Sequence, residues 1–240
     1  MAKSVRILGV RVDNVDWSDV TDFCRDALNQ SSPRQIVTVN GEFILEAQKN
    51  HEFREIINNA DLVIPDSTNV VWVSRILGTP LRAITPGSDL VCELSDLAAK
   101  DGHSIFLLGG QEGIAHKAGE RLQQINPGLK ITGTSHADPD DPYVLKHIRD
   151  SGADIVIVAY GAPRQEEWIG QHKNELGAKI LVGIGGTFDM LAGVTPRAPR
   201  VLRALHLEWL WRLILQPRRF GRIWKALVIF PLKAIFTKTD

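Results

Sequence analysis

The sequence is short of cysteine and of long hydrophobic runs. Its 240 residues include two cysteines, Cys24 and Cys92, which are far apart in the chain. A disulfide-stabilised fold would need more of them, so we expect two reduced thiols in a cytoplasmic protein.

The longest apolar run near the C-terminus, residues 226–232, ends before Lys233. A spanning helix needs roughly 20 apolar residues, and the N-terminus has no signal-peptide pattern, so we predict that nothing spans a membrane.

The chain as a whole has no excess of either charge, because 28 Lys and Arg balance 28 Asp and Glu. With 44% hydrophobic and 23% charged residues, the composition is that of a globular protein and excludes collagen-like and disordered chains. The charge is nevertheless uneven. Residues 197–240 carry a net charge of +8, from ten basic and two acidic side chains, which leaves −8 for residues 1–196. We therefore predict an acidic core over residues 1–196 and a basic appendage over residues 197–240.

The basic appendage has two amphipathic helical patterns on either side of Pro217 and holds three of the six tryptophans. Basic residues opposite Trp and Leu are typical of helices in a membrane interface, so an anionic membrane surface is the expected partner. Arg212, Arg219 and Arg222 are candidates for binding phosphate groups. Two alternatives stay open: the apolar stripes pack on the core, or self-association into a homo-oligomer buries them. Nucleic acid is not an expected partner, because the rest of the chain is acidic.

Short apolar runs alternate with longer amphipathic stretches over most of the chain. The runs expected to form strands are residues 5–10, 35–39, 62–64, 104–108, 130–132, 154–158 and 179–182. The stretches expected to be helical are residues 17–29, 41–49, 53–59, 70–77, 89–100, 113–125, 142–150 and 165–176. Several strands are apolar on both faces, as in a sheet covered by helices. The pattern predicts an α/β fold with a Rossmann-like parallel sheet flanked by helices, followed by a short C-terminal helical appendage.

Two glycine pairs come after expected strands: Gly109-Gly110 directly after the strand at 104–108, and Gly185-Gly186 separated by two residues from the strand at 179–182. Glycine lets the backbone approach a ligand closely, and a following helix N-terminus offers N–H groups, which together suit a phosphate or diphosphate. Alternatively, the pairs only make tight turns. A Walker A motif is absent and the spacing is not G-x-G-x-x-G, so a dinucleotide site is weakly indicated. A nucleotide- or NAD-binding module with a redox or regulatory role is the alternative function.

Polar side chains also follow the expected strands, at the sheet edge where ligands bind in open α/β folds. Asp66 follows the strand at 62–64; it can act as a general base for a hydroxyl, or it can cap the next helix. Thr38 and Asn40 alternate on one strand and therefore share one face. Asp189 follows the second glycine pair, where it either binds a sugar or braces the loop.

An acidic loop, Asp138-Pro139-Asp140-Asp141, resembles the D-x-D carboxylates that hold a metal-bound nucleotide sugar in many glycosyltransferases. Its proline and its position before an expected helix favour a turn and a helix cap instead. The seven histidines show no convincing ligand spacing. We therefore expect no metal site.

Taken in order, the strand-end motifs resemble those of the WecG/TagA/CpsF family of glycosyltransferases, related to N-acetylmannosaminyltransferases. The matching stretches are Thr38-Val39-Asn40, Pro65-Asp66, Gly87-Ser88-Asp89-Leu90, Phe106-Leu107-Leu108-Gly109-Gly110, Gly161-Ala162-Pro163-Arg164-Gln165-Glu166, Gly185-Gly186-Thr187-Phe188-Asp189, Arg197-Ala198-Pro199, Glu208-Trp209 and Gln216-Pro217-Arg218-Arg219. The resemblance covers nearly the whole chain.

The resemblance implies an inverting, metal-independent enzyme that needs no cofactor. It would move a hexose unit such as N-acetylmannosamine from a UDP-sugar to N-acetylglucosaminyl-diphospho-undecaprenol, for teichoic acids or related surface polysaccharides. The resemblance also implies a peripheral position on the inner face of the plasma membrane. It makes Asp66 the base and has Thr38, Asn40 and Gln165 line the sugar site.

Three departures from the family pattern lie near these residues. Ser67 follows Asp66 where the family usually has glycine. Ile84 replaces an arginine, with Arg82 nearby, and this predicts a changed clamp for the diphosphate or acceptor. His136-Ala137-Asp138 replaces Gly-Tyr-Phe, which predicts a changed wall around the nucleotide base.

Overall fold

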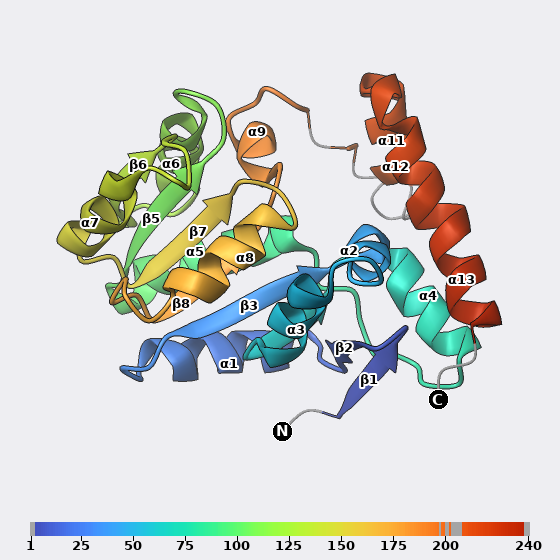
Figure 1. Cartoon of the computed structure of the whole chain (residues 1–240). Helices are drawn as coiled ribbons and strands as arrows, with labels where there is room; N and C mark the ends of the chain where they lie inside the picture. The colour runs from blue at the N-terminus through green and yellow to red at the C-terminus, as the bar shows by residue number, and fades with distance from the viewer. Residues whose placement is uncertain (1–2, 197, 200–201, 203–207, 238–240) are drawn as a thin grey trace.

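The computed structural model describes residues 3–196, 198–199, 202 and 208–237. Six strands form one parallel sheet in the order β4-β3-β8-β7-β5-β6 (Figure 1). Their bounds are Arg34–Val39 for β3, Leu62–Pro65 for β4, Ser104–Gly109 for β5, Lys130–Ser135 for β6, Ile155–Ala159 for β7 and Ile180–Gly183 for β8. The predicted α/β fold with a Rossmann-like parallel sheet is confirmed.

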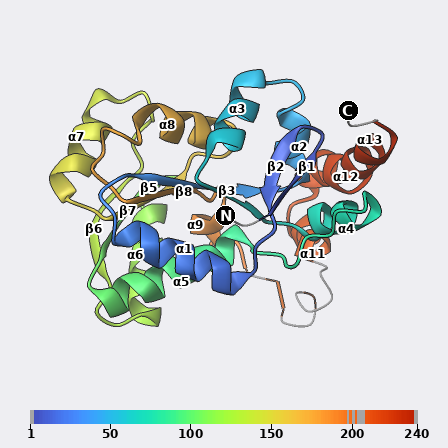
Figure 2. The same cartoon turned by 90° about the horizontal axis from the view of Figure 1, so that it is seen from below.

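Helices cover both faces of this sheet (Figure 2). One layer contains α1 (Trp17–Leu28), α5 (Gly87–Asp101) and α6 (Ile114–Ile125), and the other contains α3 (His51–Asn59), α7 (Pro142–Ser151) and α8 (Arg164–His172). Strand β7 explains why both layers are needed. Ile155 and Ile157 belong to the core beneath α1, α5 and α6, whereas Val156 and Val158 belong to the core beneath α7 and α8. A strand with no polar face must be buried on both sides.

The strand expected at residues 5–10 is wrong. The segment is a hairpin of β1 (Ser4–Ile7) and β2 (Val10–Asp13), paired antiparallel and apart from the main sheet. Leu8 and Gly9 form the turn between them, with φ values of 50° and 78°. Two-residue hairpin turns need this left-handed backbone, but leucine rarely adopts it. The apolar run therefore gave no sign of the turn. Leu8 is buried although it lies in the turn.

The remaining helices lie at the carboxyl edge of the sheet and in the appendage. They are α2 (Gly41–Glu46), α4 (Thr68–Ile76), α9 (Thr187–Leu191), α11 (Glu208–Leu215), the 3₁₀ turn η1 (Pro217–Arg219), α12 (Phe220–Trp224), the π-helical turn η2 (Lys225–Ile229) and α13 (Phe230–Phe236). Helical segments thus flank Pro217 as expected. Within the described residues, none of the helices has the length and apolarity to cross a bilayer.

The end of the appendage packs on α2 and α4 (Figure 1). Phe230 is fully buried and Ala234 nearly so, in one core cluster with the N-terminal hairpin and α2. A Cβ on Gly41 would lie 2.8 Å from Phe230 Cδ1, so glycine allows this close contact. Asn69 Nδ2 also donates to the Ala226 carbonyl at 2.6 Å. This part of the appendage is therefore held by the core.

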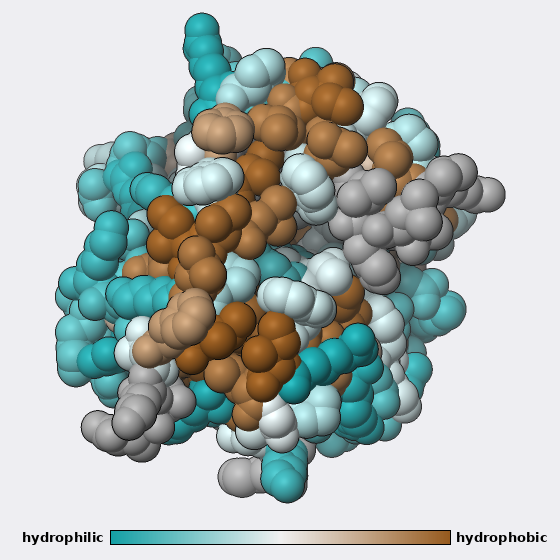
Figure 3. All heavy atoms as spheres, turned by 90° about the vertical axis from the view of Figure 1, so that its right-hand side faces the viewer, coloured by the Kyte–Doolittle hydropathy of each residue, from teal (hydrophilic) through white to brown (hydrophobic). Residues whose placement is uncertain are grey.

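Other apolar side chains of α4 and of the appendage helices remain exposed. We call them the apolar C-terminal face: Trp72 and Ile76 of α4, Phe220 and Trp224 of α12, Ile229 of η2, and Leu232, Ile235 and Phe236 of α13. Figure 3 shows hydrophobic surface gathered on this side of the molecule. Monomeric proteins rarely expose extended apolar surface without a binding role.

Candidate active site

The carboxyl ends of the parallel strands bring the predicted site residues to one edge of the sheet. Asp66 follows β4, Asn40 follows β3, Gly185 follows β8, Gly161 follows β7 and Gly110 follows β5. Because the strand order is β4-β3-β8-β7-β5, these five loops lie in a row along the edge. This is the position at which open α/β folds bind ligands.

Asp66 joins three elements at one end of this row. Its backbone N–H donates to Val39 O at 2.9 Å. Its side-chain Oδ1 accepts the N–H of Gly87, the first residue of α5, at 2.7 Å, and Oδ2 lies 3.5 Å from Asn40 Nδ2. Helix α4 begins after Ser67 without a side-chain cap. The carboxyl group therefore does not cap the helix that follows it in sequence but holds the start of α5.

Thr38 lies in β3 and Asn40 directly follows it. Asn40 caps α2, with Oδ1 accepting the N–H groups of Glu42 and Phe43 at 3.0 and 3.2 Å. Thr38 is buried, and its hydroxyl donates to the carbonyl of Gly183 at 3.3 Å. Thr38 also touches α5, because a Cβ on Gly87 would lie 3.2 Å from its Cγ2. We call Thr38, Asn40, Asp66 and Gly87 the Asp66 corner.

A cleft of about 430 Å³ lies further along the same edge. It is lined by Gly110, Gln111, Ala159, Tyr160, Asp189, Val194, Thr195 and Gln216. Pockets of this volume hold ligands of nucleotide size. Of the residues predicted to bind substrate, Gly110 and Asp189 line the cleft, while Thr38 and Asn40 belong to the Asp66 corner.

The two glycine pairs play different local roles. Gly109 has φ 104°, and a Cβ there would lie 2.9 Å from the Ala159 backbone, so the turn itself demands glycine. Gly110, with φ 77°, faces the cleft, but α6 begins only at Ile114. Gly185 has φ 51°, and Gly186 directly precedes the five-residue α9. The tight-turn alternative therefore accounts for Gly109, whereas Gly110 contributes to the cleft.

Gln165 lies beneath the loops rather than on the surface of the cleft. It is 1% exposed, and its Oε1 accepts the N–H groups of Gly161 and Gly185, each at 3.0 Å. Its Nε2 donates to Glu166 Oε1 at 2.7 Å. Burial raises the pKa of Glu166 to about 8. Sequence reasoning missed Glu166 as a site residue, because nothing in its motif shows that the carboxyl group is buried.

Comparison with known proteins shows the family to which this chain belongs. The model of the glycosyl transferase WecG/TagA/CpsF family matches residues 5–240. The chain belongs to this family. It is 34% identical over 232 residues to the N-acetylglucosaminyldiphosphoundecaprenol N-acetyl-beta-D-mannosaminyltransferase of Staphylococcus aureus strain MRSA252, covering 95% of this chain and 91% of the relative. The relative of the same name from strain NCTC 8325 matches to the same extent.

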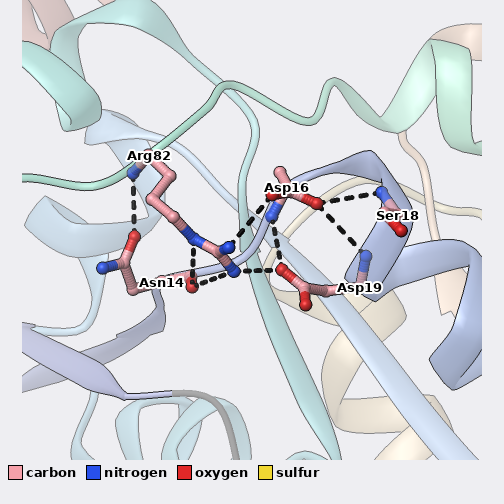
Figure 4. Close-up of polar contacts among 5 residues, drawn as sticks. All are labelled: Asn14, Asp16, Ser18, Asp19 and Arg82. Carbon is pink, nitrogen blue, oxygen red and sulfur yellow. Dashed lines mark hydrogen bonds and ion pairs between the residues drawn. The ribbon is translucent and has the colours of Figure 1, made fainter.

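The departures from the pattern of the WecG/TagA/CpsF family can now be placed. Arg82 donates to the Asn14 carbonyl and pairs with Asp16 and Asp19 at the N-terminus of α1 (Figure 4). The Asp16 backbone N–H, and then Arg82, lower the pKa of Asp19. Ile84 packs against the core cluster of α2 and α4. Arg82 is thus engaged by residues at the start of α1.

The acidic loop forms ion pairs and a helix cap. Asp138 and Asp140 both contact Arg164, at 2.7 and 3.1 Å, and Asp141 caps α7 by accepting the Tyr143 N–H. Within the part of the chain that the structure describes, no cluster of three or more His, Cys, Asp and Glu could hold a metal. The turn-and-cap interpretation of the D-x-D sequence therefore fits the geometry.

Sequence reasoning did not find several residues that line the cleft. Tyr160 lines it next to Gly161, and its hydroxyl donates to the Ala137 carbonyl at 2.8 Å, which ties the altered 136–138 loop to the cleft. Burial raises the pKa of Tyr160. Tyr160 follows a strand, so the strand-end rule could have found it. Gln216 comes from the appendage and contacts Thr195 at 3.4 Å, and no local pattern indicates this.

One of the three predicted arginines is engaged near the Asp66 corner. Arg222 Nε and Nη2 donate to Glu42 Oε2 at 2.8 and 2.6 Å, and Glu42 lies in the first turn of α2, which Asn40 caps. The side chains of Arg212 and Arg219 lie outside the described residues. The appendage therefore reaches both the cleft, through Gln216, and the border of the Asp66 corner, through Arg222.

Proposed function

We propose that this chain transfers N-acetylmannosamine, or a related hexose, from a UDP-sugar to N-acetylglucosaminyl-diphospho-undecaprenol. The names of its relatives support the donor sugar and the acceptor. The observation that carries the proposal is the Asp66 corner, in which a carboxyl group is oriented on the same sheet edge as a cleft of about 430 Å³. The product belongs to the synthesis of a surface polysaccharide such as teichoic acid.

In this reaction, the cleft holds the UDP portion of the donor. Gly110, Gly185 and Gly186 bring backbone close to the diphosphate, and Asp189 contacts the sugar. The proposed reaction uses no metal, so positive side chains must neutralise the diphosphate. We assign this role to arginines of the appendage: Arg212, Arg219 and Arg222. Arg222 supports this role, and binding of the acceptor diphosphate as well, because it lies beside the Asp66 corner and can exchange its partner Glu42 for a phosphate group.

Asp66 acts as the general base. It accepts the proton of the acceptor hydroxyl while that oxygen attacks the anomeric carbon, and UDP leaves from the opposite face, which inverts the anomeric configuration. A positioned base of this kind contributes about 10²–10⁴-fold in rate. The contacts of Asp66 with Gly87 and Asn40 supply the positioning.

The appendage, residues 197–240, binds the membrane that carries the acceptor. The apolar C-terminal face supplies the surface that enters the lipid. Arg222, Lys225 and Lys233 lie on the same helices, and Arg218 lies in the preceding turn η1. Each basic residue near an anionic leaflet adds on the order of 1 kcal/mol. The enzyme would then lie on the inner face of the plasma membrane, where sugar nucleotides are available.

The experiment that tests the function is product analysis with a synthetic lipid-diphosphate-N-acetylglucosamine acceptor. UDP-N-acetylmannosamine and other UDP-sugars are offered in turn, and a thermal-shift series with UDP and NAD runs beside it. We expect transfer of one sugar with a β linkage and stabilisation by UDP alone. A product with the retained configuration would overturn the inverting mechanism, and stabilisation by NAD alone would favour the redox alternative.

A further inference from the structure

Two buried polar neighbours, Gln165 and Glu166, lie in the first turn of α8 behind the cleft. Gln165 is 1% exposed and Glu166 is fully buried. Burying an amide and a carboxyl group costs free energy unless their hydrogen-bonding atoms are matched. The proposed chemistry at Asp66 does not use Glu166, so its burial needs another explanation.

One oxygen of Gln165 joins two loops of the cleft. Gln165 Oε1 accepts the N–H of Gly161, next to Tyr160, and the N–H of Gly185, which precedes α9 and Asp189. Tyr160 and Asp189 both line the cleft. A single side-chain carbonyl therefore links the two walls, above the point where β7 and β8 are paired.

That carbonyl points to the loops only in one of the two orientations of the amide group. In the reversed orientation the NH₂ group would face two N–H donors, with which it cannot form hydrogen bonds. Glu166 Oε1 accepts from Gln165 Nε2 at 2.7 Å and so selects the observed orientation. A Cβ on Gly183 would lie 2.6 Å from the same oxygen, so the carboxyl group is confined against the backbone of β8.

The neutral acid performs this task without placing an unpaired charge in the core. Burial raises the pKa of Glu166 to about 8, and the field of Glu167 acts in the same direction. Glu166 Oε2 has no hydrogen-bond partner among the described residues. A protonated carboxyl group still offers its carbonyl oxygen as an acceptor.

We infer that Glu166 is a positioning residue: it holds the Gln165 amide in the orientation that ties the Gly161 and Gly185 loops together and so shapes the cleft for its ligand. Gln165 then acts through the backbone of both loops. The inference rests on the proposed function for the identity of that ligand, UDP-sugar. Fixing the supporting residues of a site lowers the cost of ordering it on binding.

The first test compares three variants of the full-length protein by titration calorimetry with UDP. Glu166→Met keeps the length of the side chain but removes the acceptor, so we expect UDP to bind about tenfold more weakly, the value of one buried hydrogen bond. Its unfolding temperature should fall, because the buried Gln165 Nε2 is left without an acceptor. Glu166→Gln keeps an acceptor oxygen and should recover most of the affinity. Glu167→Gln, a matched control whose carboxylate bonds Asn50, should bind as wild type does.

A double-mutant cycle with Gln165→Ala then separates positioning from general packing. If Glu166 acts through Gln165, Glu166→Met should cause no further loss of UDP affinity in the Gln165→Ala protein. Additive losses, or wild-type affinity of Glu166→Met, would overturn the inference.

Amide hydrogen exchange at Gly161 and Gly185 tests the same contact without any ligand. Exchange at both positions should accelerate in Glu166→Met and remain slow in Glu166→Gln. Failure of the wild type to bind UDP would refute the proposed function, whereas unchanged exchange at both glycines would refute the positioning role of Glu166.

Discussion

In most proteins polar side chains are exposed and large apolar side chains are buried. The sheet edge and the apolar C-terminal face depart from this rule in opposite ways. At the edge, polar groups such as Gln165 and Glu166 are buried and hydrogen-bonded to one another. On the face, Trp224 and Phe236 are 50% and 79% exposed. Buried polar groups and exposed apolar surface are both informative exceptions. The difference is between side chains fixed by hydrogen bonds at the edge and apolar side chains on the face that are open to the membrane partner proposed above.

The two regions are nevertheless coupled through the appendage. Phe230 anchors α13 in the core, and Arg222 of α12 pairs with Glu42 beside the Asp66 corner. Substitutions can therefore break one region, break the other, or affect the contact between them.

Asp66→Asn should break the chemistry of the edge and leave the face unchanged. Asparagine can still accept the Gly87 N–H, so the corner should keep its shape, but it cannot take a proton from the acceptor. We expect kcat to fall by about 10²–10⁴-fold, with unchanged UDP affinity and vesicle binding. Asp96→Asn, an exposed carboxylate of α5 that pairs with Lys100, is the control. Near-normal turnover of Asp66→Asn would rule out the base assignment.

Phe230→Ala should detach the appendage from the core. Removing a fully buried phenyl ring costs about 3–5 kcal/mol of stability, and the cavity would open against Gly41. Phe236→Ala on the same helix is the matched control, because its side chain is 79% exposed. Denaturant unfolding gives the stability, and limited proteolysis reports release of the C-terminal helices. Equal losses in both variants would contradict the anchoring role.

Stability should depend on pH through Glu166. Its pKa is raised from the model-compound value of 4.5 to about 8, so the folded state binds more protons than the unfolded state between those pH values. Stability therefore falls as the pH rises through this range, by a few kcal/mol at most. Glu166→Gln cannot titrate, and its stability relative to wild type should rise between pH 5 and pH 9. Parallel stability curves for the two proteins would be inconsistent with a buried titrating carboxyl group.

Trp224→Ser should weaken membrane binding while leaving the edge intact. Burying a large apolar side chain yields about 1.5–3 kcal/mol, so a half-exposed one that enters lipid should account for about a tenfold change in partitioning. Sedimentation with anionic vesicles measures this, and turnover of a water-soluble acceptor should not change. Tyr143→Ser on α7, 75% exposed but far from the appendage in the fold, is the control. Equal sedimentation of both variants would exclude the face as the membrane contact.

Glu42→Gln addresses the contact between the two regions. Exposed ion pairs contribute about 0–1 kcal/mol, so stability should barely change. The variant frees Arg222 for the acceptor diphosphate, and the KM for the lipid acceptor should fall by a few-fold. Arg222→Gln should raise the same KM. Identical KM values for both variants would show that the pair has no influence on acceptor binding.

Local sequence patterns were sufficient for most of the sheet because its strands are buried on both faces. The runs at 104–108 and 154–158 contain almost no polar residue, and they form β5 and β7 within a residue of the predicted bounds. The same rule failed for the N-terminal run, because Leu8 adopts a left-handed turn conformation that is unusual for leucine. The strand-end rule located Asp66, Asn40 and Gly110, whose final positions follow from parallel strands alone.

The sequence by itself determined the alternation of strands and helices, the family, and the residues at the strand ends, because each depends on local spacing or ordered motifs. Tertiary structure decided which partner each residue has. Asp66 holds Gly87 instead of the next helix, Gln165 joins two loops, and Gln216 reaches the cleft from the appendage. These contacts join segments far apart in the chain, and only the packing of helices on the sheet sets such distances.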